Sequence, residues 1–326
     1  MRSIEICAGA GGQALGLEQA GFDHLALIEI DPAACATLRK NRPNWNVVEG
    51  DIRTFSAVEY RGMVDLLAGG IPCPPFSIAG KQLGHDDERD LFPEVIRLVN
   101  ECRPRAIMVE NVRGLFDKKF DAYRCKIKDD LASFGYDCVW ELVQAHSFGV
   151  PQQRPRTVLV AFAENTLQYF QWPANLLEPP VTVGQSLLGE MAGNGWSGAE
   201  NWARKANGIA PTLVGGSKKH GGADLGPTRA RKAWEKLGVD GSGIADSPPG
   251  KGFSGNPKLT VKMASIVQGF PSDWEITGKK TSAYRQVGNA FPPPVAKAIG
   301  VAIHRALSYS GEEQEADYNE RTRLAG

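Results

Sequence analysis

One cysteine in this chain is placed where a nucleophile could act. Cys73 lies between prolines in the segment 69–77 (GGIPCPPFS), after an apolar run at 64–68 that is typical of a buried strand. Prolines on both sides exclude helix and ladder pairing, so the chain must leave the sheet here as a stiff loop. A thiol at such a position can attack carbon once a neighbour lowers its pKa or removes its proton. The alternative is a buried structural cysteine.

The elements around Cys73 alternate between strand and helix patterns. We expect strands at 3–7, 25–30, 46–48, 64–68, 106–109, 136–143 and 157–162, and helices at 13–20, 32–40, 91–102 and 126–134. This alternation predicts an α/β fold with an open, mostly parallel sheet and helices on both faces. Ligands bind beyond the carboxyl ends of the strands in such sheets. The expected strand ends hold Gly9, Glu29, Asp51, Cys73 and Glu110.

A glycine loop at 8–12 (AGAGG) joins the first expected strand to the first helix. Glu29 follows Gly12 by 17 residues, at the end of the second strand. A carboxylate about 20 residues after a glycine loop is the Rossmann-type arrangement for binding ribose hydroxyls. Glycines also let a ligand approach the backbone. Taken alone, the loop fits an ordinary tight turn equally well.

Length and composition limit the classes of protein. The chain has 326 residues, 42% hydrophobic and 23% charged, which is enough for one large domain and a smaller one. We expect no membrane span, since no run of about 18 apolar residues occurs, and no signal peptide at the N-terminus. The six cysteines form no CxxC pair and no zinc-ligand spacing, which favours a reducing cytoplasm and argues against a metal.

The pattern changes after about residue 173. The segment 189–255 holds 16 of the 37 glycines, and within 204–236 eight basic residues stand against two acidic ones. A neutral chain that concentrates positive charge in this way is expected to face a polyanion, the alternative being a solvated surface. We therefore expect a large domain at 1–175, completed by 275–310, an irregular second domain at 176–274, and a polar tail at 311–326 that frays.

The order of motifs resembles that of the bacterial DNA (cytosine-5)-methyltransferases of restriction-modification systems, over nearly the whole chain. Six segments carry the resemblance: 6–12 (ICAGAGG), Glu29 with 51–52 (DI), 70–73 (GIPC), 110–112 (ENV), 152–156 (QQRPR) and 286–290 (QVGNA). The resemblance implies a Rossmann-like methyltransferase fold, with the irregular segment as the target-recognition domain. It also implies methyl transfer from S-adenosylmethionine to C5 of a flipped-out cytosine in duplex DNA, leaving S-adenosylhomocysteine.

The resemblance assigns roles to individual residues. Cys73 is the nucleophile that attacks C6, and Glu110, if protonated, supports N3, which would need a raised pKa. Arg154 helps to hold the base and Arg156 orders the site. The residues expected to hold the cofactor are Cys7, Ala8, Gly9, Gly11, Gly12, Glu29, Ile30, Asp51, Ile52, Gly70, Pro72, Leu91, Asn289 and Ala290. Those expected to contact DNA are Ser77, Arg89, Gln152, Arg204, Lys205, Thr212, Lys218, Lys219, His220, Arg229 and Arg231.

Two positions depart from the family pattern. Cys7 stands where the family usually has Phe, which predicts a weaker cofactor contact or one through the Cys7 backbone alone. Pro74 stands where many members have Gln, and it stiffens the loop. The resemblance further implies a cytoplasmic, nucleoid-associated bacterial monomer with a companion endonuclease acting on the same site.

Three other functions compete with this interpretation. The same chemistry on transfer RNA occurs in one branch of the family. A non-catalytic DNA-binding relative would lack the nucleophile, the carboxylate or the glycine loop, and here all three are present. A nicotinamide dehydrogenase would share the glycine loop and Glu29 but would leave Cys73 and the arginine pair unexplained.

Overall fold

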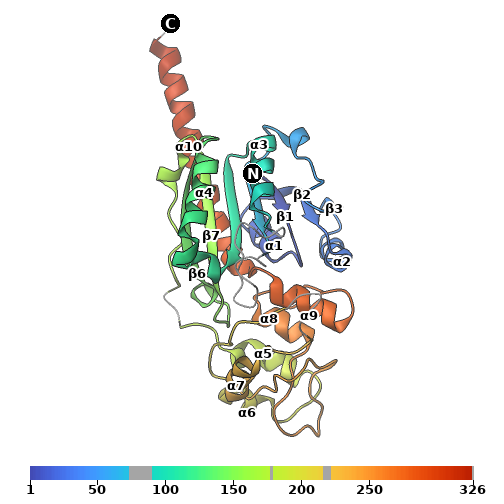
Figure 1. Ribbon diagram of the computed structural model, residues 1–326. Coiled ribbons are helices and arrows are strands. Elements are labelled where there is room, and N and C mark those ends of the chain that lie inside the picture. The colour runs from blue at the N-terminus through green and yellow to red at the C-terminus, as the bar shows by residue number, and fades with distance from the viewer. Residues whose placement is uncertain (73–89, 177–178, 216–221, 325–326) are drawn as a thin grey trace.

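A seven-stranded sheet organises the larger part of the molecule (Figure 1). The computed structural model describes residues 1–72, 90–176, 179–215 and 222–324, with side chains up to 309. The strands are β1 (Arg2–Ile6), β2 (Asp23–Glu29), β3 (Val47–Glu49), β4 (Leu66–Gly70), β5 (Ala106–Val112), β6 (Tyr136–Gln144) and β7 (Pro155–Ala163). They lie in the order β3-β2-β1-β4-β5-β7-β6. Strand β7 runs in the direction opposite to that of the other six. The expected α/β fold with a mostly parallel sheet is confirmed.

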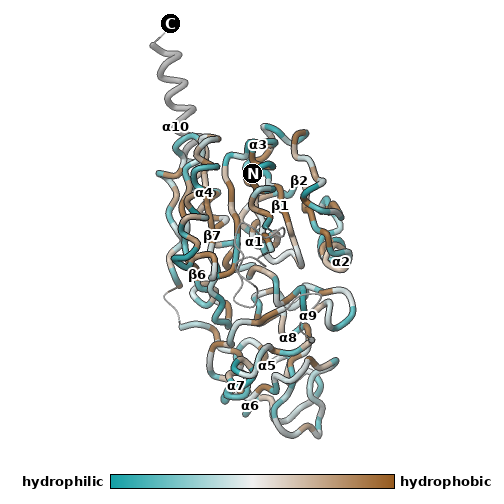
Figure 2. The backbone as a smooth tube through the Cα atoms, in the orientation of Figure 1, coloured by the Kyte–Doolittle hydropathy of each residue, from teal (hydrophilic) through white to brown (hydrophobic). Residues whose placement is uncertain are grey.

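Helices cover both faces of this sheet. The helices of this part are α1 (Gly12–Gln19), α2 (Pro32–Asn41), α3 (Phe92–Cys102), α4 (Asp121–Ala132) and α10 (Pro293–Leu324). Residues of α3 and α4 share one apolar core with the sheet, and residues of α1 and α10 share another. In Figure 2 the apolar colour is concentrated on the central strands. Short 3-10 turns lie at Val58–Tyr60, Arg113–Phe116, Lys118–Phe120, Ala145–Phe148 and Thr166–Tyr169.

The C-terminal helix returns to pack against the first helix. A Cβ atom at Gly16 would lie 2.4 Å from the carbonyl oxygen of Pro293, and one at Gly300 would lie 2.9 Å from side-chain atoms of Leu17 and Ala20. Glycine is therefore needed where α1 and α10 cross. The backbone of α10 stays helical to Leu324, whereas the sequence predicted a frayed tail at 311–326. Its last turns extend beyond the body of the molecule (Figure 1).

A second group of helices has an apolar core of its own. These helices are α5 (Val183–Ala192), α6 (Ala199–Lys205), α7 (Thr228–Lys236), α8 (Val261–Val267) and α9 (Lys280–Asn289). Their shared core includes Trp202, Trp234 and Met263, and also Tyr284 and Val287 of α9. The sequence placed residues from 275 onward with the sheet, but α9 buries its apolar side in this second core. In the described part of the chain, no helix combines the length and apolar character that a membrane crossing requires.

A buried acid lies in the central strand of the sheet. Glu5 of β1 is fully buried, and the side-chain amide of Gln13 in α1 donates to its Oε2 at 3.4 Å. Burial raises the pKa of Glu5 to about 8, and the Gln13 hydrogen bond opposes this only in part. Because an unfolded chain ionises this carboxyl near its ordinary pKa, the folded state binds one more proton between about pH 4.5 and 8.

We expect the free energy of unfolding to fall as pH rises through that range. Glu5→Gln removes the ionisable group, so the variant should lose this part of the pH dependence and be roughly 1–3 kcal/mol more stable than the parent at pH 8. Urea unfolding at pH 5, 6.5 and 8 measures the effect. Glu200→Gln, at an exposed position of α6, serves as the control. Parallel pH profiles for parent and Glu5→Gln would show that Glu5 does not titrate on unfolding.

Candidate functional site

The carboxyl ends of β1 and β2 are tied together by one carboxylate. Glu29, the last residue of β2, accepts the backbone N–H of Gly9 at Oε2 and that of Asp31 at Oε1, both at 2.7 Å. Burial raises the pKa of Glu29, while the two amides act in the opposite direction. The carboxylate is thereby fixed beside the glycine loop, where the sequence predicted a ribose-binding acid.

The three glycines of the loop have different roles. A Cβ atom at Gly9 would meet open space, with only the Cys7 carbonyl oxygen 4.0 Å away. At Gly11 it would lie 2.7 Å from Leu38, and at Gly12 it would lie 2.1 Å from the Phe291 carbonyl oxygen. The space beside the backbone is therefore open at Gly9, whereas protein fills the Cβ side of Gly11 and Gly12. Gly9 is the position at which a ligand can approach the backbone.

Cys7 occupies a strained position at the start of this loop. Its φ of 52° lies in the left-handed region, which residues other than glycine adopt at a cost. Burial and the charge of Glu29 raise the pKa of the Cys7 thiol far above its ordinary value. The thiol therefore stays protonated and is a poor nucleophile. Ala8 follows as a buried residue whose N–H donates to the Ile28 carbonyl at 3.1 Å.

The ends of β2 and β3 present one apolar and one acidic group. Ile30 is 61% exposed and extends the edge beyond Glu29. Asp51 forms an ion pair with Arg53 at 3.0 Å, and hydrogen bonds from Arg53 lower the pKa of this carboxyl. Ile52, also expected to contact the cofactor, points its side chain into the core beneath the sheet. The free apolar surface at this edge is therefore that of Ile30.

Next along the sheet, β4 leads toward the expected nucleophile. Its last residue, Gly70, pairs with Glu110 of β5, and a Cβ atom there would lie 3.2 Å from Glu110 Oε2. Glycine thus leaves room for the carboxylate above the end of β4. Ile71 is buried, Pro72 is exposed, and the half-buried Leu91 precedes α3. The expected site residues Cys73, Ser77 and Arg89, together with Pro74, lie outside the described residues.

Glu110 forms a largely buried ion pair with Arg156. Arg156 Nε lies 2.6 Å from Glu110 Oε1, and the side chains are 12% and 9% exposed. The pair forms because β7 runs antiparallel to β5, with Arg156 opposite Val112, so the first residues of β7 lie at the carboxyl end of β5. Burial raises the pKa of Glu110, and the charges of Arg156 and Arg154 only partly counteract it. This carboxyl is therefore prepared to hold a proton.

Arg154 has a different role from the one expected. Its guanidinium is fully buried and donates to the carbonyls of Leu213, Gly288 and Ala290 at 2.8, 2.8 and 2.9 Å. The sequence assigned the base contact to Arg154 and the ordering role to Arg156, but the Arg154 side chain is fully buried and bonded internally. Arg154 joins three chain segments, whereas Arg156 contacts the acid at the strand edge.

Gln152 extends the same buried network. Its side chain is fully buried, donates to Gln268 Oε1 at 2.8 Å and accepts the Leu213 N–H at 2.8 Å. The expected DNA contact of Gln152 is therefore corrected to an internal one, because no surface of the side chain is left for a ligand. The Thr212 hydroxyl donates to the Gln153 carbonyl. Sequence reasoning missed Gln268, which donates to the Ala290 carbonyl.

The remaining candidates lie on the second group of helices and at the end of α9. Asn289 is exposed and Ala290 is buried. Arg204 and Lys205 are exposed at the end of α6, and Arg229 and Arg231 are exposed on α7. The expected DNA contacts Lys218, Lys219 and His220 lie outside the described residues.

Known proteins resemble this chain along most of its length. The family model described as "C-5 cytosine-specific DNA methylase" matches residues 1–305. The type II methyltransferase M.NaeI of Lentzea aerocolonigenes is 55% identical over 318 residues, which cover 96% of this chain and 76% of that protein. The type II methyltransferase M.NgoMIV of Neisseria gonorrhoeae is 56% identical over 308 residues, covering 94% and 97%.

Solved structures share the fold at lower sequence identity. The Entamoeba histolytica methyltransferase EhMeth superimposes with a TM-score of 0.67 at 15% identity, covering 94% of this chain and 98% of that one. The S. pombe Dnmt2 methyltransferase gives a TM-score of 0.61 at 17% identity, with coverage of 94% and 98%.

Substitutions of Arg154 and of Arg156 should lower the free energy of unfolding by different amounts. Arg154→Met leaves three buried carbonyls without their donor, so we expect it to lower the free energy of unfolding by about 3 kcal/mol or more. Arg156→Met should cost less, because Glu110 can take up a proton once its partner is gone. Chemical denaturation of the two variants measures the difference. Equal losses would mean that Arg154 has no special structural role.

Proposed function

The chain belongs to the family of C-5 cytosine-specific DNA methylases, and we propose that Cys73, Glu110 and Arg156 carry out its methyl transfer to cytosine C5. The observation that most supports this assignment is the pairing of Gly70 with Glu110. Only Ile71 and Pro72 separate Gly70 from Cys73, so Cys73 follows, within three residues in the sequence, the strand end that holds the acid. Arg156 holds the acid from the other side at 2.6 Å.

The proposed reaction overcomes the low reactivity of the cytosine ring. The sulfur of Cys73 forms a bond to C6, which breaks the aromaticity of the ring and makes C5 nucleophilic. S-adenosylmethionine, when bound, would supply the methyl group and leave as S-adenosylhomocysteine. Water or hydroxide then takes the C5 proton, the electrons of the C5–H bond form the C5–C6 double bond, and the Cys73 thiolate leaves C6, so that the ring becomes aromatic again. Because C6 is shielded inside a stacked duplex, the target base must be flipped out.

Glu110 supports the ring while Cys73 is attached to it. Negative charge builds on N3 during the attack, and a protonated carboxyl can donate to that atom. The raised pKa of Glu110 suits this role. Arg156, at the rim of the same site, fixes the orientation of the carboxyl and limits how far its pKa rises.

The residues at the ends of β1, β2 and β3 fit S-adenosylmethionine. Gly9 leaves open space, Ile30 offers an exposed apolar side chain for the adenine, and Asp51 offers a carboxylate at the same edge. Each Glu29 oxygen accepts one amide and keeps a lone pair for a ribose hydroxyl. Cys7, whose backbone is held in the left-handed conformation at the start of this loop, would contribute through its backbone.

The second group of helices is proposed to read the DNA. Its separate core makes it a rigid unit, and its exposed basic residues suit a polyanion. The relatives M.NaeI and M.NgoMIV are type II methyltransferases. We therefore propose that this protein acts as a monomer on one short duplex sequence in a restriction-modification system. It would protect that sequence from a companion endonuclease.

Base-resolution bisulfite sequencing tests the activity. The full chain is expressed in a bacterial host that lacks cytosine methylation, and the host DNA is sequenced. Protected cytosines within one recurring short sequence are the expected result, and they would identify the recognition site. Uniform conversion with soluble protein would count against DNA as the substrate, and bisulfite sequencing of the host transfer RNA would then test the alternative.

Cys73→Ser should abolish methyl transfer while leaving DNA binding within about threefold of the parent, because the hydroxyl is a much weaker nucleophile on an otherwise unchanged loop. Methylation is measured with labelled cofactor, and binding by fluorescence anisotropy. Cys125→Ser, which changes the exposed cysteine of α4, is the matched control and should retain full activity. Turnover by Cys73→Ser at the parent rate would exclude the covalent mechanism.

Glu110→Gln should change how the rate depends on pH. We expect a bell-shaped profile for the parent, rising as Cys73 loses its proton and falling as Glu110 loses its own. The glutamine variant should be slower by about 100-fold or more and should lack the falling limb. Single-turnover rates between pH 6 and 10 measure both effects. A falling limb that persists unchanged in the variant would assign it to another group.

A further inference from the structure

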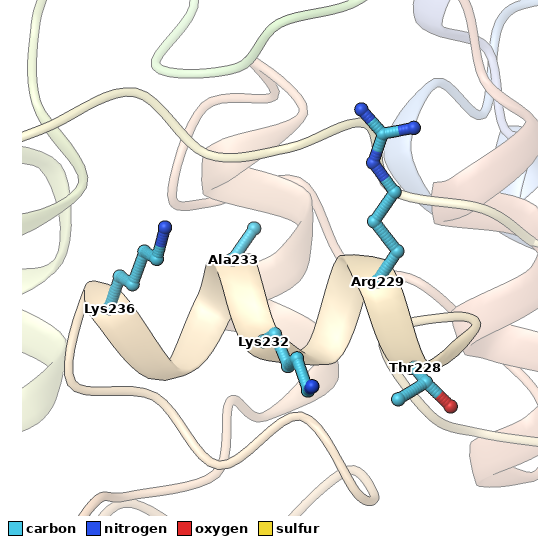
Figure 3. Close-up of a pocket in the computed structure, with 5 residues that line it drawn as sticks. All are labelled: Thr228, Arg229, Lys232, Ala233 and Lys236. Atoms are coloured by element: carbon cyan, nitrogen blue, oxygen red, sulfur yellow. The ribbon is translucent and has the colours of Figure 1, made fainter.

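Helix α7 carries a row of exposed cations on one side and packs its other side into the second apolar core. Arg229, Lys232 and Lys236 are exposed, and with Thr228 and Ala233 they line one pocket. Figure 3 shows Arg229, Ala233 and Lys236 projecting from one side of the helix, with Lys232 on the adjoining side. The small side chain of Ala233 leaves a hollow between long basic ones. Trp234, fully buried in the second core, fixes the helix from behind.

The charges on this face differ from those of three other lysines that are at least partly exposed in the same part of the molecule. Lys258, Lys262 and Lys280 lie 3.8, 2.9 and 2.6 Å from carboxylates of Asp240, Glu190 and Asp246. Among the described residues, no carboxylate oxygen lies within 4.0 Å of the charged nitrogens of Arg229, Lys232 or Lys236. Like charges so close together on one helix repel each other. An external anion would relieve that repulsion.

The spacing of the row suits a DNA strand. Arg229 and Lys236 are seven positions apart, which corresponds to about 10 Å along a helix axis. One strand of duplex DNA advances about 3.4 Å per phosphate, so the row spans roughly three phosphates. Lysine acts as a point charge on phosphate, whereas base reading favours planar, bidentate side chains. Two of the three cations are lysines, which favours backbone contact over base reading.

Two neighbouring basic residues, Lys205 and Arg231, are placed differently. Lys205 of α6 packs its stem near the end of α7, because its Cδ would lie 3.3 Å from a Cβ atom at Gly238. Arg231 is turned away, since its Nε donates to the Gly226 carbonyl at 2.9 Å and its side chain packs against Gly241. Arg231 thus bonds to the chain at the start of α7 and is not part of the row.

We propose that the α7 face formed by Arg229, Lys232 and Lys236 binds the phosphate backbone of the substrate duplex without reading its bases. This inference rests on the proposed function, because it takes duplex DNA as the substrate. It adds residues that the sequence did not single out, Lys232 and Lys236, and it gives Arg229 a positioning role. The face sets the register and strength of DNA binding, and sequence choice comes from other residues.

The test compares two triple variants of the full chain. Arg229→Gln with Lys232→Gln and Lys236→Gln removes the row. Lys258→Gln with Lys262→Gln and Lys280→Gln removes three lysines, one exposed and two partly exposed, that already have carboxylate partners. DNA dissociation constants are measured by fluorescence anisotropy from 50 to 300 mM NaCl, on a duplex carrying the methylated sequence and on an unrelated duplex of equal length. Thermal unfolding confirms that both variants are folded, and Lys232→Gln with Lys236→Gln replaces the first triple if it is not.

We expect the slope of log affinity against log salt to become less negative by about 2 to 3 for the row variant, equally on both duplexes. The control should keep the parent slope, and the methylated sequence found by bisulfite sequencing should not change. A parent-like slope in the row variant would overturn the proposal. A loss confined to the methylated duplex, or a changed methylation sequence, would also overturn it and assign the row to base reading.

The same measurements separate this proposal from the proposed function. A parent protein that binds duplex DNA with the expected slope but methylates no cytosine would contradict the function and leave the phosphate contact standing. A parent that methylates DNA, beside a row variant with unchanged salt dependence, would contradict the phosphate contact alone.

Discussion

The buried guanidinium of Arg154 is the interaction on which the rest of the site depends. A charge removed from water must have its donors satisfied, and this one has carbonyls of Leu213, Gly288 and Ala290 as acceptors. Two of those carbonyls come from the end of α9 and the residue after it, and the third comes from Leu213, in the chain between α6 and α7. Two residues further on, Arg156 contacts Glu110. The arginine that holds the acid at the sheet edge thus closely follows a residue that is tied to both of these segments.

The order of strands divides the sheet edge into two halves. The ends of β3, β2 and β1 carry Asp51, Glu29 and Gly9, which suit the cofactor, whereas β5 and β7 carry Glu110 and Arg156. Strand β4 lies between β1 and β5 and leads to Cys73. Methyl donor and target base can thus approach the same strand end from opposite sides. The reversed direction of β7 is essential, because a parallel strand would place Arg156 at the far edge of the sheet.

Burial and charge are distributed differently in the two parts of the molecule. Near the sheet edge, ionisable groups are buried and tightly partnered, which raises the pKa of Glu110 and fixes Glu29 by two backbone amides. On α7, basic side chains are exposed and lack a carboxylate partner among the described residues. The first arrangement suits bond making in a dry site, and the second suits a polyanion that binds and leaves in a salt-dependent way.

The sequence by itself determined the α/β fold, the strand ends that form the site and the family, because strand periodicity, glycine loops and motif order are local properties of the chain. It also indicated where positive charge gathers. Only the tertiary structure decided which of Arg154 and Arg156 meets Glu110, since the two side chains are chemically identical and lie only two positions apart in the sequence. The tertiary structure also showed that Gln152 is buried and does not lie on a DNA-binding surface. It showed that other parts of the protein pack against Gly11 and Gly12. These outcomes depend on contacts between residues 27 to 279 positions apart, such as Gly11 with Leu38 and Gly12 with Phe291, which no local pattern encodes.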